Sequence, residues 1–72
     1  MKVIKEGDFV VANFVYSADG RNDKDIRGIV LNVPLFPGDM WLIKEKYYGD
    51  GLVVINPLHT FLESIIVVED KQ

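Results

Sequence analysis

The chain contains no cysteine and only one histidine among its 72 residues. Without cysteine it has neither a disulfide framework nor a thiolate metal site to stabilise the fold. A domain of this size buries only roughly 60% of the surface that its unfolded chain exposes. Stability must therefore come from aliphatic packing, from closure of a sheet, or from association with a partner.

Long apolar runs and an excess of basic residues are also missing. No segment approaches the ~20 apolar residues that span a bilayer, and residues 1–6 lack the apolar core of a secretory signal. We therefore expect a soluble, unexported protein of the cytoplasm. The absence of cysteine fits this reducing compartment, where disulfides are rare. Eight basic and eleven acidic residues give a net charge of −3. This sign disfavours nucleic acid and anionic membranes as partners, although a local basic patch can act against the net charge.

What the sequence does contain is a set of short β-prone runs separated by turn residues. Ile26–Val33 is predicted to be the central strand, because it is rich in aliphatic residues and ends at Pro34. The other expected strands are Phe9–Tyr16, Met40–Tyr47, Leu52–Ile55 and Ser64–Val68. Asp50-Gly51 favours a tight hairpin turn between two of them, and the polar segment Ser17–Asp25 is expected to form a solvated loop.

Several details of these strands can be predicted. Gly28 marks a place where the strand bends or another backbone approaches closely, and the odd spacing from Val30 to Val33 indicates a β-bulge. In the first strand both faces are mostly apolar, and we expect Val10 and Ala12 to point inward. The alternating charges at the end of Met40–Tyr47 favour an edge strand.

The end of the chain is predicted to contain one helical turn and a last strand. Leu58–Glu63 is long enough for a single helical or 3₁₀ turn whose apolar residues share a face. The whole chain, residues 1–72, then forms one domain: a five-stranded all-β barrel with a short helical turn before the last strand. Residues 1–5 and 69–72 are expected to be frayed tails.

The order of short motifs resembles that of the SH3-like small barrels. It runs from Gly7-Asp8-x-Val10 through Gly28-x-Val30-x-x-Val33 to a strand bearing Trp41, a glycine-rich turn and Ser-Ile-Ile-Val-Val-Glu. Residues 6–69 are most similar to KOW-type domains and to small uncharacterised barrels of bacteriophages and bacteria. The acidic and tyrosine-rich first strand of proline-motif-binding domains is absent, so the resemblance implies a fold and not an activity.

Residues that would carry catalysis are sparse. A nucleophile–base pair would need His59 with Ser17, Ser64 or Thr60 and an acid such as Glu63. Adjacency along the chain does not aim these side chains at one another, so His59 is interpreted as a surface or half-buried residue. We expect no enzyme activity.

Metal and phosphate sites are not predicted either. Asp19, Asp23 and Asp25 crowd one loop, but Arg21 and Lys24 nearly neutralise it and the spacing fails that of a calcium loop. Gly49-x-Gly51 joins two strands and lacks the following helix of a phosphate-binding loop. No cofactor or metal is therefore expected.

The aromatic residues are the more informative set, because they fall at strand ends and in flanking loops. Leu35 and Phe36, between two prolines, either plug the barrel, which is the favoured alternative, or stay exposed for binding. Trp41 and Phe36 either complete a thin core or contact a partner. The candidate interaction surface consists of Tyr16, Leu35, Phe36, Trp41, Tyr47 and Tyr48.

We therefore expect a small non-enzymatic protein-interaction module, encoded by a phage as an accessory or host-interacting protein, that contacts a protein partner. Self-association is a second form of this hypothesis, because the first and last strands are apolar enough to pair with a copy of themselves. The alternative is a KOW-like nucleic-acid-binding domain that acts with a transcription or translation partner and contacts nucleic acid through Arg27, Lys44 and Lys46.

Overall fold

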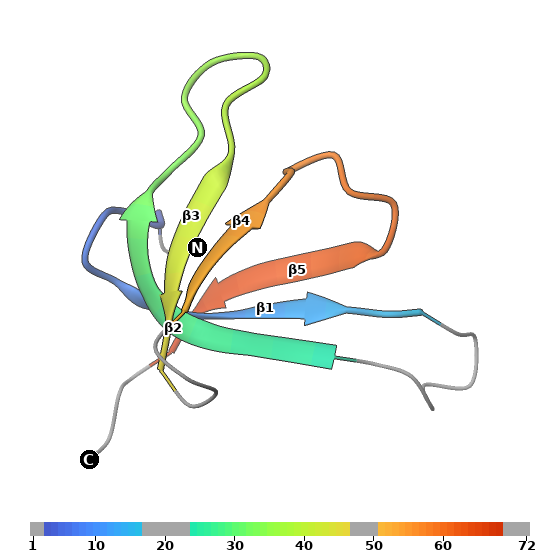
Figure 1. The fold of residues 1–72 in the computed structure, drawn as a ribbon, viewed down its shortest axis with the longest axis horizontal. Coiled ribbons are helices and arrows are strands. Elements are labelled where there is room, and N and C mark those ends of the chain that lie inside the picture. Colours follow the sequence, from blue (N-terminus) through green and yellow to red (C-terminus); the bar gives the residue numbers. More distant parts are fainter. Residues whose placement is uncertain (1–2, 17–23, 47–50, 69–72) are drawn as a thin grey trace.

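Over the residues that the structure describes, the chain forms a five-stranded antiparallel sheet (Figure 1), and the sequence predicts five strands. The computed structural model describes residues 3–16, 24–46 and 51–68. Its strands are β1 (Phe9–Phe14), β2 (Lys24–Asn32), β3 (Trp41–Glu45), β4 (Leu52–Ile55) and β5 (Leu62–Val67). They lie in the order β4-β3-β2-β1-β5, so β2 is the central strand. Within the described residues no hydrogen-bonded ladder joins β4 to β5.

Strand β2 belongs to both halves of the sheet. Its first part, Lys24–Ile29, pairs with β1, and its last part, from Gly28 to Asn32, pairs with β3. Figure 1 shows that β2 bends where these two parts meet. The sheet therefore folds over itself, with β1 and β5 on one side of the bend and β3 and β4 on the other.

Two features predicted for β2 are confirmed at this bend. A Cβ atom on Gly28 would lie 2.1 Å from the backbone oxygen of Lys44, so the β3 backbone approaches too closely for any side chain. The pairing with β3 shifts register between Val30 and Asn32, which makes Leu31 the extra residue of a bulge. Both features increase local curvature, and they let one continuous strand bend from one half of the sheet into the other.

The core lies between the two halves of the folded sheet. Val10 and Ala12 are fully buried, which confirms that this face of β1 points inward. The buried cluster consists of Val10, Ala12, Phe14, Ile26, Val30, Ile43 and Ile55. The opposite face of β1 is covered as well: Phe9 and Val11 are each 8% exposed, and the Lys46 ammonium lies 5.4 Å from the centre of the Phe9 ring.

The segment before β1 extends the pairing with β2. The Gly7 amide donates to the Val30 carbonyl at 2.8 Å, and the Val30 amide donates to the Asp8 carbonyl at 2.9 Å. Gly7 has φ +94°, which this tight turn requires and which favours glycine. The turn places Ile4 against the core cluster.

The edge expected at β3 is wrong, and of the two strands expected to pair with a second copy only β5 lies at an edge of the sheet. Strand β3 pairs with both β2 and β4, so its charged end does not mark an edge. Strand β1 pairs with both β2 and β5, so it has no free edge for a second copy. The outermost strands are β4 and β5, because the chain returns after β4 and adds β5 beside β1.

The prediction of a helical turn before the last strand is also wrong. Within the described part of the chain there is no helix, and residues 56–62 form two successive turns. Their backbone hydrogen bonds run from the His59 amide to the Asn56 carbonyl and from the Leu62 amide to the His59 carbonyl. The Asn56 side chain also accepts the Leu58 amide at 2.8 Å, and His59 Nδ1 accepts the Phe61 amide at 3.1 Å. These local side-chain bonds compete with helical hydrogen bonding and stabilise isolated turns.

Described residues include no helix long and apolar enough to cross a membrane.

Candidate functional site

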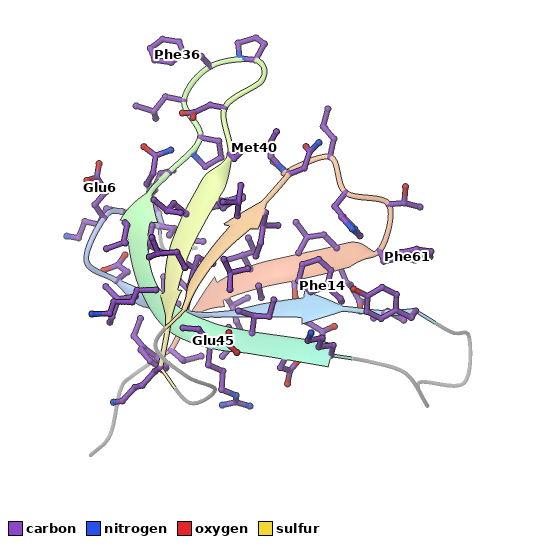
Figure 2. The ribbon with its side chains drawn as sticks, in the orientation of Figure 1. Glu6, Phe14, Phe36, Met40, Glu45 and Phe61 are labelled. Carbon is purple, nitrogen blue, oxygen red and sulfur yellow. The ribbon has the colours of Figure 1, made fainter. Side chains whose placement is uncertain are left out.

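The loop Pro34–Met40 between β2 and β3 presents two apolar side chains to solvent. Leu35 is 76% exposed and Phe36 is 73% exposed. The loop projects beyond the ends of both strands, with Phe36 near its tip (Figure 2). The favoured prediction that this pair plugs the barrel is therefore wrong. The pair stays exposed because the loop runs away from the core and carries Leu35 and Phe36 with it.

This loop is braced by the carboxylate of Asp39. Asp39 Oδ2 accepts the Leu35 amide at 3.3 Å, and Oδ1 accepts the Met40 amide at 3.0 Å. The Asn32 side-chain amide donates to the Met40 carbonyl at 2.8 Å and to Asp39 at 3.3 Å. The Asp39 amide donates back to the Phe36 carbonyl at 3.0 Å, and Gly38 has φ +89°. Two prolines further restrict the loop, so it holds Leu35 and Phe36 in a preformed arrangement.

Hydrogen bonding from the Leu35 amide, then from the Met40 amide and the Asn32 side chain, lowers the pKa of the Asp39 carboxyl. Because folding lowers this pKa, the stabilisation by the carboxylate is complete above the ordinary aspartate value of about 4. It is lost as the pH falls through the lowered value.

We expect the loop to loosen only in that acidic range. An NMR titration should show the Leu35 and Met40 amide shifts moving with one midpoint below the ordinary aspartate value. Asp39→Ala should abolish this transition. A midpoint at or above the ordinary value would contradict the hydrogen bonds described for Asp39.

An apolar groove lies beside the base of the same loop. It has a volume of about 590 Å³. Its lining residues are Val3, Ile4, Val33, Trp41, Ile65, Ile66 and Val67. Trp41 is half-buried: it packs against the core cluster, as one of the two alternatives predicts, and it also lines the groove.

Tyr16 lies apart from the loop, in a cluster of aromatic rings at the end of β1. Its ring centre is 6.1 Å from that of Phe14, in a stacked arrangement, and 5.0 Å from that of Phe61. The His59 ring meets Phe14 edge-on at 5.3 Å. Figure 2 shows Phe14 and Phe61 far from Phe36. The expected aromatic surface is therefore divided, and Tyr47 and Tyr48 lie outside the described residues.

The basic residues of the nucleic-acid hypothesis share the outer face of the sheet. Lys44 pairs with Ile29, and the Lys46 amide donates to the Arg27 carbonyl at 2.9 Å. Arg27 on β2 therefore lies close to Lys44 and Lys46, which belong to the neighbouring chain segment. A shallow hollow of about 190 Å³ is lined by Ile29 and residues 44–46. Acidic groups interrupt this patch: the Arg27 guanidinium lies 3.6 Å from the Asp25 carboxylate, and Glu45 also lines the hollow.

His59 has a structural part in this arrangement, since its Nδ1 holds the turn before β5. Across the described ranges no group of three or more His, Asp or Glu side chains is placed to hold a metal ion. Asp19 and Asp23 of the acidic loop lie outside those ranges. Asp25 accepts a hydrogen bond from the Asn13 side chain at 2.6 Å.

Sequence reasoning missed most of the groove. Ile65 and Val67 were expected in the last strand. The sequence did not indicate that the segments containing Ile4 and Trp41 would lie beside them. The available signal was the apolar run Ile65–Val67 in β5 together with an apolar residue, Ile4, ahead of the Gly7 turn.

No protein-family model, curated protein or solved structure matches the chain.

Proposed function

We propose that the protein is a small protein-interaction module whose contact surface is the braced Leu35–Phe36 loop with the groove at its base. The exposure of Leu35 and Phe36 is the single observation that carries the proposal. Burying one such side chain contributes roughly 1.5–3 kcal/mol, so leaving both in water has a cost that a partner would remove. Because Asp39 and the prolines already order the loop, binding loses little conformational entropy there.

We further propose that the folded sheet is a small barrel of the SH3-like type. Its strand order supports this assignment: β1 to β4 follow one another as a meander, and β5 adds to the free side of β1. The bend at Gly28 and the bulge at Leu31 curve the sheet in the manner that a barrel of few strands needs.

Nucleic-acid binding through Arg27, Lys44 and Lys46 is the weaker alternative. The three cations do share one face, which favours it. However, Asp25 and Glu45 lie among them, and the chain carries a net charge of −3. A surface that gains affinity by neutralising phosphates would need a less interrupted positive patch.

Site-specific photo-crosslinking tests the proposed function. The photoreactive amino acid p-benzoylphenylalanine would replace Phe36 in one variant and Leu58 in a matched control. Leu58 is 88% exposed, so it is at least as accessible as Phe36 but lies on the turn before β5. We expect discrete protein adducts from position 36 in cell extract and none from position 58. Equal adducts from both positions, or none from position 36, would contradict the assigned surface.

A further inference from the structure

The chain carries both a pair of apolar projections and an apolar hollow of suitable size. Leu35 and Phe36 are exposed on the loop, and the groove holds about 590 Å³ next to it. Building on the proposed function, we propose that the partner is a second copy of this chain. The Leu35–Phe36 loop of each copy fills the groove of the other.

The position of the groove explains why such an exchange would be reciprocal. Val33 and Trp41 line the groove, and they are also the residues that flank the loop Pro34–Met40 on either side. Loop and groove are therefore neighbours on one surface. A two-fold axis passing between them brings each loop to the opposite groove, which gives a closed dimer instead of an open chain.

The contact chemistry fits an apolar insertion. All the groove-lining residues are aliphatic or aromatic, and none carries a charge. On the loop, the amides of Leu35, Asp39 and Met40 are hydrogen-bonded within the loop itself. Insertion therefore leaves these three polar groups satisfied, and the Asp39 carboxylate keeps its donors.

The area is sufficient for a dimer, although not a large one. At the exposures found for Leu35 and Phe36, the two side chains present roughly 250 Å² to solvent. Two inserted loops and the groove walls that they cover would together bury roughly 1,000 Å². This is close to the lower limit for a specific interface, so a dimer that dissociates in the micromolar range is expected.

Light scattering on wild type, on two variants and on the mixture of these variants tests the exchange. Phe36→Lys places a charge on the loop, and Ile66→Asp places one in the groove. We expect wild type to be dimeric and each variant to be monomeric, with at least a tenfold weaker association. Mixing the two variants at equal concentration should restore a dimer. In that heterodimer one contact pairs the lysine with the aspartate, and the other contact is that of wild type.

Two further variants control for folding and for charge. Val3→Asp changes a groove residue that is 82% exposed, so it alters the groove without touching the core. It should behave as Ile66→Asp does. Leu58→Lys introduces the same charge as Phe36→Lys on an exposed leucine elsewhere, and it should remain dimeric. A monomeric wild type at high concentration, or dimeric loop and groove variants, would overturn the exchange.

The crosslinking product distinguishes this inference from the proposed function. An adduct from position 36 with twice the mass of the chain supports both. An adduct with a different protein leaves the proposed function standing and overturns the second copy as partner. The absence of any adduct from position 36 contradicts both.

Discussion

Replacing Gly28 with alanine is expected to cost the domain more than ~3 kcal/mol of unfolding free energy. The added Cβ would lie 2.1 Å from the Lys44 carbonyl oxygen, 2.8 Å from its carbon, and 2.9 Å from Ile43 Cγ2. Two of these atoms are backbone, so relief requires β2 and β3 to separate at the bend. A chain of 72 residues has an ordinary stability of about 4–11 kcal/mol, of which this is a large part.

Gly51→Ala is the matched control, because a Cβ at that position meets nothing within 4 Å. Urea unfolding followed by circular dichroism should show a strongly lowered midpoint for Gly28→Ala and an unchanged one for Gly51→Ala. Similar midpoints for wild type and Gly28→Ala would contradict the close approach of β2 and β3.

Truncating Ile43 to alanine should cost about 2–5 kcal/mol. Ile43 is completely buried and belongs to the cluster between the two halves of the sheet. Removing its side chain loses the transfer free energy of the missing methyl and methylene groups and leaves a cavity that a thin core cannot easily close. The measurement is again the midpoint of urea unfolding, with the slope checked for two-state behaviour.

Leu52→Ala provides the comparison for Ile43→Ala. Leu52 is 63% exposed on the neighbouring strand β4, where it pairs with Lys44. Its loss should change the unfolding free energy by less than ~0.5 kcal/mol. Equal losses of unfolding free energy at positions 43 and 52 would contradict the assignment of Ile43 to the buried face of the sheet and of Leu52 to the solvated face.

Much of the fold was predictable, because local signals were strong. The aliphatic run from Ile26 onward, its interruption by Gly28, and the odd spacing from Val30 to Val33 predicted the central strand, the close backbone approach and the bulge. These signals act within a few residues of the chain. They depend on backbone sterics and on the period of two in a strand.

The sheet edges were not predictable in the same way. Which strands lie outermost depends on whether the chain returns beside β1 or beside β4, and a strand of five residues carries no mark of that choice. The charged end of β3 favoured an edge because charged side chains on an edge strand discourage pairing with another sheet. In this sheet they have a different reason: one face of the sheet is solvated, and charged side chains of an inner strand can lie on that face.

The candidate site was predicted in part. Leu35, Phe36 and Trp41 were identified from their aromatic or apolar character beside strand ends. The exposure of Leu35 and Phe36 depends on how Asp39 and Asn32 direct the loop, through contacts that a sequence does not display. Tyr16 was placed on the same surface, but it contacts Phe14 and Phe61 instead, because β1 carries it to the opposite end of the sheet.

The most direct test of the loop-in-groove pairing is the fluorescence of Trp41, the single tryptophan of the chain. Trp41 lines the groove, so a partner loop that fills the groove would exclude water from its ring. With rising protein concentration, the wild-type emission should shift to the blue and become protected from acrylamide, whereas that of Phe36→Lys should stay constant. Wild-type emission and quenching that do not change with concentration would contradict the pairing.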